Sequence, residues 1–176
     1  MTYTHLISAE QLMALHASGA PLQVFDCSGE LGDAAKADAM FADKRIAGAV
    51  QAHLERDLSA HAAQDAVNGG RHPLPKRELF AQTLQALGFE NRMQAVVYDR
   101  NGANYCGRLW WMLKWAGHDA VAVLDGGLQA WEAAGGALEQ QVQRSLSLAI
   151  LMATVKICSS INSRPMSSSS APGLVR

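Results

Sequence analysis

The chain has 176 residues, of which 49% are hydrophobic and 18% are charged, and its formal net charge is −1. This length and composition suit one soluble domain with a sizeable core, and the near-neutral charge excludes a strongly basic surface for nucleic acid or membrane. The three cysteines and six histidines show no CxxC, HxxxH or HExxH spacing. We therefore expect no disulfide framework, no metal site and no cofactor.

The two ends of the chain carry no targeting or membrane signal. The N-terminus, MTYTHLISAEQ, lacks the basic segment and the long apolar core of a secretory signal. The most apolar stretch near the C-terminus, residues 146–155, has only ten residues, whereas a helix across a bilayer needs about 20. We therefore expect a cytoplasmic protein without a membrane segment.

In the first half of the chain, the residue pattern predicts a helix and two strands separated by loops. Residues 8–11 form a Ser-x-x-Gln capping box, which begins a helix. Residues 22–26 are typical of a buried strand that ends in an acid, and residues 27–38 are typical of a loop. Residues 45–50 lead into a short strand, and residues 59–75 form a long polar connection.

In the second half, helices and strands alternate. An amphipathic helix is predicted over residues 76–87, and an apolar strand over residues 95–98. A helix through residues 109–114, a strand at 120–124 and a helix through residues 128–131 follow. This alternation favours an α/β fold of three layers, with helices on both faces of a parallel sheet of about five strands.

The loop after the strand at residues 95–98 carries the candidate chemistry. A strand, a glycine-containing loop and a helix start bring backbone N–H groups together in a cup that attracts anions. A cysteine at the base of such a cup would act as a thiolate nucleophile, because the N–H groups lower its pKa. The residues of this loop are Asp99, Arg100, Asn101, Gly102, Ala103 and Asn104.

Several pieces of the chain match the motifs of one known family. They are the strand ending in Asp26, Arg45-Ile-Ala-Gly-Ala-Val50, Trp110-Trp111-Met-Leu, Gly117-His118 and Leu124-Asp-Gly-Gly-Leu-Gln-Ala-Trp131. Together they cover about residues 9–138 and resemble the rhodanese family, in particular the first domain of two-domain thiosulfate/3-mercaptopyruvate sulfurtransferases. The segment at residues 45–50 departs from the family's His-Ile-Pro-Gly-Ala pattern, since it has Arg for His and Ala for Pro.

The resemblance implies that the nucleophile is absent from this chain. In the family's active domain, a cysteine follows the central strand and opens a Cys-x-x-Gly-x-Thr-Ala loop, whereas Asp99 has that position here. A carboxylate is a poor nucleophile toward sulfur and would repel thiosulfate, so we expect Asp99 to fill the cup and to cap the following helix. We therefore expect no sulfur transfer by the chain alone. In the full-length family, the partners would be small sulfur-containing anions and a second rhodanese domain.

Other side chains near the loop are weaker candidates. We interpret Cys106 as a small, half-buried residue inside the helix, with a displaced sulfur-carrying thiol as the alternative. Cys27 follows a strand end and is a still weaker candidate nucleophile. Arg100 and Arg108 flank the loop and could contact substrate charge, although such residues more often pair with local acids or face solvent.

Two classes of function remain open from the residues alone. One is a sulfurtransferase fragment, or a weak sulfurtransferase that uses Cys106. The other is a non-catalytic rhodanese module that binds or regulates a partner. A phosphatase loop of the form Cys-x5-Arg is excluded, because Met112 stands where the arginine would be.

Residues 139–176 differ in character from the rest of the chain. They lack helix or strand periodicity and include a run of serines at 167–170, so we expect a mostly disordered tail after a domain at residues 9–138. A frameshift or a truncation would explain such an abrupt change. Either would leave exposed the apolar surface that normally meets a second domain, and this surface would favour self-association.

Overall fold

The computed structural model describes residues 2–140. Its centre is a five-stranded sheet in the order β1-β6-β5-β2-β4, in which every neighbouring pair is parallel. A separate antiparallel pair joins β3 (Arg45–Ile46) to β7 (Leu138–Glu139). The strands of the central sheet are β1 (Leu6–Ile7), β2 (Leu22–Asp26), β4 (Val50–Gln51), β5 (Gln94–Tyr98) and β6 (Val121–Leu124).

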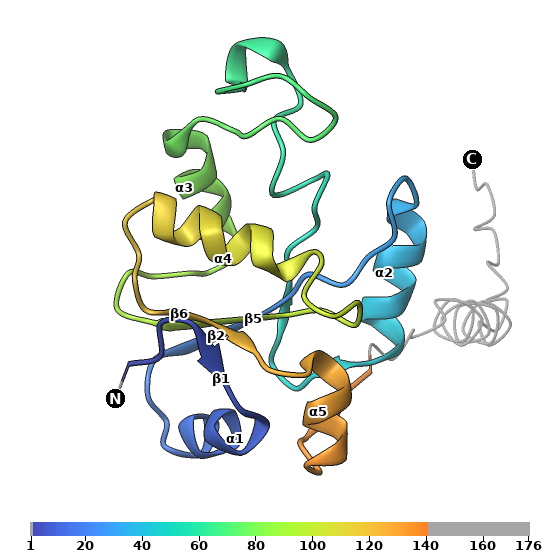
Figure 1. The fold of residues 1–176 in the computed structure, drawn as a ribbon, viewed down its shortest axis with the longest axis vertical. Helices are drawn as coiled ribbons and strands as arrows, with labels where there is room; N and C mark the ends of the chain where they lie inside the picture. Colours follow the sequence, from blue (N-terminus) through green and yellow to red (C-terminus); the bar gives the residue numbers. More distant parts are fainter. Residues whose placement is uncertain (1, 141–176) are drawn as a thin grey trace, which may run out of the picture. The chain divides into compact units, whose positions relative to one another are not determined.

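Helices cover both faces of this sheet. They are α1 (Ala9–Ala17), α2 (Ala34–Asp43), α3 (Arg77–Ala86), α4 (Cys106–Trp115) and α5 (Gly127–Ala133), with a short 3-10 helix at Ala63–Asp65. α3 and α4 pack on one face, and α1 and α5 pack on the other (Figure 1). The predicted three-layer α/β fold with a parallel sheet of about five strands is therefore confirmed.

The central strand β5 explains why the sheet needs helices on both sides. All five of its residues are buried. Ala95 and Val97 face the core beneath α3 and α4, whereas Val96 and Tyr98 face the core beneath α1 and α5. Successive side chains of a strand point to opposite faces, so an apolar run such as this one is stable only when both faces are covered.

Two local predictions from the sequence need correction. Residues 34–38, expected as loop, form the start of α2, because the Asp33 carboxylate caps the helix by accepting from the Lys36 N–H at 2.9 Å. The alanine-rich stretch that follows has high helix propensity. The single short strand expected near residues 45–50 is two strands, β3 and β4, divided by a turn in which Gly48 has a φ of +75°.

The described fold extends slightly beyond residues 9–138 at both ends. Tyr3 exchanges backbone hydrogen bonds with the Gln94 side chain at 2.9 and 2.8 Å, which fastens the segment before β1 to β5. At the other end, Glu139 pairs with Arg45 across the β3–β7 ladder. The expected tail began at residue 139, but Glu139 belongs to β7. Residues 141–176, the rest of that expected tail, lie outside the described residues. No helix within residues 2–140 is long and apolar enough to cross a membrane.

The start of α5 requires glycine at position 127. Gly127 has a φ of +58°, and a Cβ there would lie 2.3 Å from the backbone oxygen of Asp99. We expect Gly127→Ala to lower the free energy of unfolding by about 2–4 kcal/mol, because it adds a backbone clash to an unfavourable φ. Urea unfolding of the purified variant measures this change.

Gly107→Ala is the matched control for that variant. Gly107 lies inside α4 with nothing within 4 Å of a Cβ. Alanine there should leave stability unchanged or raise it by up to about 1 kcal/mol, since alanine is the better helix former. Equal stability of Gly127→Ala and the unmodified protein would contradict the close approach between α5 and Asp99.

Candidate functional site

The candidate site lies at the carboxyl end of the central sheet, where ligands of parallel α/β proteins usually bind. Asp99 directly follows β5, Cys27 directly follows β2, and Asp125 directly follows β6. The loop from Asp99 leads into α4, whose first residue is Cys106. Three of the candidates from the sequence, Asp99, Cys106 and Cys27, therefore lie at one edge of the sheet.

The Asp99 carboxylate occupies the cup formed by its own loop. One oxygen, Oδ1, accepts from the backbone N–H groups of Asn101 and Ala103, both at 2.9 Å. The other, Oδ2, accepts from the N–H groups of Tyr105 at 2.8 Å and Cys106 at 3.0 Å. Asp99 is only 1% exposed, so the buried negative charge is compensated by these four donors and by the N-terminus of α4.

The loop adopts a specific backbone conformation to aim these N–H groups inward. Gly102 and Ala103 both have positive φ, at +70° and +67°. Ala103 is the one non-glycine residue with positive φ among residues 2–140, and such a conformation costs about 1–3 kcal/mol. Gly102 adopts its positive φ without strain, because it has no Cβ. The exposed Asn104 makes no hydrogen bond to the Asp99 carboxylate.

Backbone contacts fasten the cup to α5. The Asp99 carbonyl oxygen accepts from the Leu128 N–H at 3.2 Å, and the Arg100 carbonyl oxygen accepts from the Gln129 side chain at 3.0 Å. The loop is therefore held from both sides, by its own carboxylate within the cup and by the start of the next βα unit.

The sequence indicated that Cys106 lies inside the helix. The structure places it at the cup instead. It is the first residue of α4 and is 1% exposed, not half-buried, because its side chain packs into the core between β5 and α4. Burial, reinforced by the nearby Asp99 carboxylate, raises the pKa of the Cys106 thiol well above its ordinary value. A thiol held in the protonated form is a poor nucleophile.

Cys27 is also a buried thiol with a raised pKa. Its side chain is 4% exposed, and burial raises the pKa of its thiol, with further contributions from Cys106 and Asp26. Cys158 lies outside the described residues. Both thiols that the structure describes are therefore in surroundings that oppose the thiolate.

The Arg100 side chain turns away from the cup. Its guanidinium donates to the backbone oxygen of Met40 at 2.8 Å and to that of Lys44. It also lies 3.6 Å from a carboxylate oxygen of Asp26. The Tyr98 hydroxyl donates to that same oxygen at 2.7 Å. The guanidinium thus joins the cup loop to the end of α2.

The Arg108 guanidinium is also committed to backbone oxygens. It donates to Leu58 at 2.8 and 3.1 Å and to His72 at 3.0 Å. These bonds fasten both ends of the long polar connection to α4. Burial without a paired acid lowers the pKa of Arg108, although a guanidinium remains charged at neutral pH. Neither candidate arginine presents its charge to the cup.

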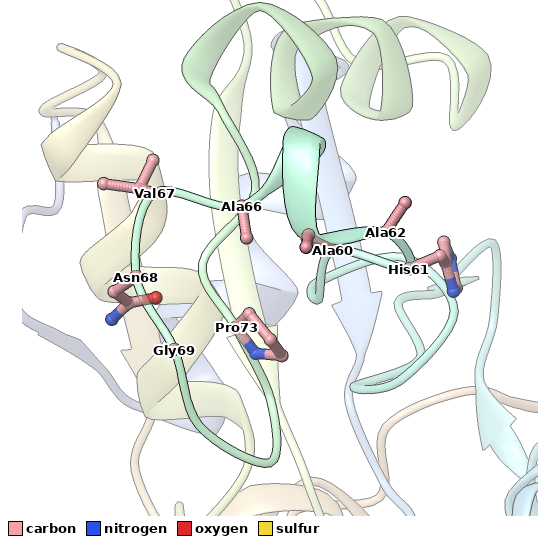
Figure 2. A pocket seen from close by; sticks show the side chains of 9 residues that line it. Ala60, His61, Ala62, Ala66, Val67, Asn68, Gly69 and Pro73 are labelled. Carbon is pink, nitrogen blue, oxygen red and sulfur yellow. The ribbon is translucent and has the colours of Figure 1, made fainter.

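The hollow drawn in Figure 2 belongs to the long connection, not to the cup. It has a volume of about 590 Å³ and walls mostly of alanine, valine, glycine and proline side chains. Each of its two polar side chains already makes one hydrogen bond to the backbone. Asn68 accepts from the Leu74 N–H at 2.8 Å, and the His61 ring meets the Arg56 carbonyl oxygen at 3.0 Å. The hollow therefore offers little to orient a polar ligand.

The network around Asp26 was not predicted from the sequence. Asp26 is 1% exposed and accepts from the Ser28 N–H as well as from Tyr98. The Ile46 N–H in turn donates to the Tyr98 hydroxyl at 3.1 Å. The signal in the sequence was an acid at the end of each of two buried strands, Asp26 after residues 22–25 and Asp99 after residues 94–98. Asp26 was interpreted only as the end of a strand, whereas a structural role was predicted for Asp99.

A three-layer α/β fold with a main-chain cup at the end of its central strand is typical of a rhodanese-like domain. Residues 8–134 match the rhodanese-like domain family, and the chain belongs to that family. It is similar to the probable 3-mercaptopyruvate sulfurtransferase of Pseudomonas aeruginosa, with 42% identity over 139 residues that cover 78% of this chain and 48% of the relative.

Two further relatives also match most of this chain over less than half of their own length. Human 3-mercaptopyruvate sulfurtransferase is 35% identical over 128 residues, which cover 70% of this chain and 40% of that protein. The structure of 3-mercaptopyruvate sulfurtransferase from Leishmania major superposes with a TM-score of 0.66 at 28% identity, covering 81% of this chain and 38% of that one. The chain thus spans about half the length, or less, of the curated relatives it matches.

The contacts of Asp99 predict that its carboxylate is needed for stability. We expect Asp99→Ala to lower the free energy of unfolding by about 2–4 kcal/mol, because it leaves four inward-pointing N–H groups without their acceptor. The free energy of unfolding of Asp99→Asn should lie between those of the unmodified protein and Asp99→Ala, since one amide oxygen can replace only part of the carboxylate. Urea unfolding at constant pH measures the series.

Asp125→Ala is the control, because Asp125 follows β6 as Asp99 follows β5, but its side chain is exposed. We expect its effect to stay within about 0.5 kcal/mol. Equal effects of the two alanine variants would show that the cup does not depend on the Asp99 carboxylate.

The burial of Cys27 and Cys106 predicts that both thiols are inert in the folded protein. In a Cys158→Ser background, we expect almost no reaction with a thiol reagent at pH 8, because the raised pKa of each thiol leaves little thiolate at that pH. Both thiols should react within minutes once the protein is unfolded in guanidinium chloride. Rapid labelling of Cys106 in the native protein would contradict its buried position.

Proposed function

We propose that this chain is the non-catalytic rhodanese domain of a thiosulfate/3-mercaptopyruvate sulfurtransferase, and that it transfers no sulfur by itself. The observation that carries the proposal is the occupation of the cup by the Asp99 carboxylate. In an active rhodanese domain, the resemblance places a cysteine at this position, where the main-chain N–H groups would stabilise its thiolate and bind the substrate anion.

The charge of Asp99 argues against a small anionic substrate in this cup. Thiosulfate and 3-mercaptopyruvate are both anions, and a buried carboxylate in the same ring of donors repels them while satisfying the N–H groups that would bind them. A carboxylate also cannot carry sulfane sulfur. Cys106 is no replacement, because burial and Asp99 keep its thiol protonated. We therefore assign sulfur transfer to a separate rhodanese domain that carries a cysteine.

The partner in this proposal is that cysteine-bearing domain. The sulfurtransferases from Pseudomonas aeruginosa and human extend well beyond the region matched here, which leaves room in them for another domain of similar size. On this chain, Leu6 is 61% exposed and Leu31 is 52% exposed. Leu6 lies beside the cup loop, in a hollow that Gly102 and Ala103 also line. Leu6, an exposed apolar side chain next to the cup, would suit such a contact.

A second candidate function uses the same observation. A rhodanese domain whose cup is filled by its own acid could serve as a binding or regulatory module for a partner protein, without any catalytic domain. The two candidates differ in what this chain must bind. The first requires association with a cysteine-bearing rhodanese domain, and the second does not.

Activity assays on the purified chain test the proposal directly. We expect thiosulfate:cyanide and 3-mercaptopyruvate turnover at background, because the nucleophile position holds a carboxylate. Robust turnover that disappears in Cys106→Ser would overturn the proposal and identify Cys106 as the sulfur carrier. Asp99→Cys is the companion variant, since it restores a thiol at the cup, and its thiol should have a pKa clearly below about 8.5.

The choice between the two candidates rests on a binding measurement. The part of the Pseudomonas aeruginosa relative outside the matched region can be purified and mixed with this chain, and calorimetry then measures their association. Binding that is weakened by Leu31→Lys but not by Lys36→Ala would support the sulfurtransferase assembly. Absence of binding at high micromolar concentration would favour the regulatory module.

A further inference from the structure

Two tryptophans and one arginine form a stack on the surface of α3 and α4. The indole rings of Trp111 and Trp115 lie nearly parallel, with 6.0 Å between their centroids and 10° between their planes. The Arg77 guanidinium, from the first residue of α3, lies 4.7 Å from the centroid of the Trp115 ring. We call these three side chains the Trp–Arg stack. Because a helix rises about 1.5 Å per residue, the two tryptophans lie about 8 and 14 Å along α4 from its first residue at the cup.

Trp111 gives the stack an exposed aromatic surface. It is 48% exposed, more than any other Phe, Tyr or Trp side chain within residues 2–140. Its helix neighbours Met112 and Leu113 are fully buried, so α4 turns Trp111 away from the sheet. An apolar or aromatic side chain of a partner would remove this ring from water, which favours binding.

Arg77 gives the stack a positive charge that no acid of the described chain neutralises. Most basic side chains within residues 2–140 pair with an acid, as Arg92 does with Glu90 at 2.7 Å. Arg77 and its neighbour Lys76 are exposed and form no ion pair within these residues. A guanidinium held beside an aromatic ring keeps its planar fork of N–H donors available for a carboxylate.

We propose that the Trp–Arg stack binds a peptide segment of a partner protein in which a carboxylate side chain lies next to an aromatic side chain. The carboxylate accepts from the Arg77 guanidinium, and Lys76 adds a second positive charge beside it. The aromatic side chain packs on the exposed ring of Trp111. Binding here leaves the cup free, so it goes beyond the function proposed above and applies to both candidates.

The charge of the surrounding surface excludes a polyanion as the occupant. Residues 2–140 contain all 16 acidic residues of the chain but not all of its 15 basic residues, so this part of the chain is negative overall. A nucleic acid requires many phosphate contacts, and the stack offers only Arg77 and Lys76. Two positive charges beside an aromatic surface match a short segment with one or two carboxylates.

A peptide titration of the full chain tests this proposal. The probe is the acetylated and amidated peptide Gly-Glu-Tyr-Glu-Gly, and proton–nitrogen NMR of the labelled protein follows the indole N–H signals of Trp111 and Trp115. We expect saturable shifts of both signals, with a dissociation constant below about 1 mM at low salt. The peptide Gly-Gln-Tyr-Gln-Gly should bind at least about tenfold more weakly, since it lacks the carboxylates.

Variants of the stack separate the contributions of charge and aromatic surface. Arg77→Gln should weaken binding of the acidic peptide at least about tenfold, and Trp111→Ala at least about threefold. Arg77→Lys should lie between Arg77→Gln and the unmodified protein, because it keeps the charge but loses the planar fork. Arg92→Gln and Leu138→Ala are the matched controls and should leave binding unchanged. Arg92 is already paired with an acid, and Leu138 is a similarly exposed apolar residue of β7.

Three results of the titration would overturn the proposal. They are the absence of saturable shifts, equal affinity for the two peptides, and shifts of the same signals by inorganic phosphate at a lower concentration than the acidic peptide. The last result would identify a simple anion site. Equal weakening by Arg77→Gln and Arg92→Gln would also contradict the proposal, because binding would then depend on the overall charge and not on the stack.

Discussion

The hydrogen bonds from four loop N–H groups to the Asp99 carboxylate determine the geometry of the sheet's carboxyl end. A buried charge is tolerated only where donors surround it, so the loop must keep the conformation that turns Asn101, Ala103, Tyr105 and Cys106 inward. That conformation includes the unfavourable φ of Ala103. The position of the Asp99 backbone also constrains α5. The first turn of this helix approaches that backbone so closely that position 127 must be glycine.

The same cup can serve opposite purposes, depending on one side chain. A ring of main-chain donors at a helix N-terminus has no preference for a particular anion. With a thiolate at its base, it would stabilise a nucleophile and leave space for a substrate. With Asp99, the donors are satisfied from within and the neighbouring Cys106 thiol is held in its protonated form. The same loop backbone can therefore surround either a thiolate or the carboxylate that fills this cup.

Much of this arrangement could be predicted from the sequence, for reasons that particular elements make plain. β5 and β6 are apolar runs bounded by loop residues, and the capping box of α1 forms as expected, with Ser8 accepting from Gln11. The start of α2 was missed, because small residues that follow Gly29 and Gly32 are typical of a loop unless Asp33 is interpreted as an N-cap. The expectation that Cys106 is half-buried was wrong, since sequence alone does not tell which helix face meets the sheet.

The arginines show where prediction from the sequence ends. Arg100 bonds to backbone oxygens of Met40 and Lys44, and Arg108 bonds to those of Leu58 and His72. Backbone oxygens occur at every position, so nothing in the residue pattern distinguishes an arginine that anchors a distant segment from one that awaits a substrate.

The order of the strands has a consequence for how the chain is made. β1 leaves the ribosome before the other strands of this sheet, yet its sole neighbour in the sheet is β6, which is the last strand of that sheet in the sequence. Until residues 121–124 emerge, Leu6 and Ile7 have no strand to pair with, and β5 has an open edge on the side that β6 later covers. Pairings this distant in sequence form slowly, and open edges are prone to misassociation. The nascent chain therefore passes through a stage in which its central strand is half paired, a stage at which chaperones that cover exposed strands would be of most use.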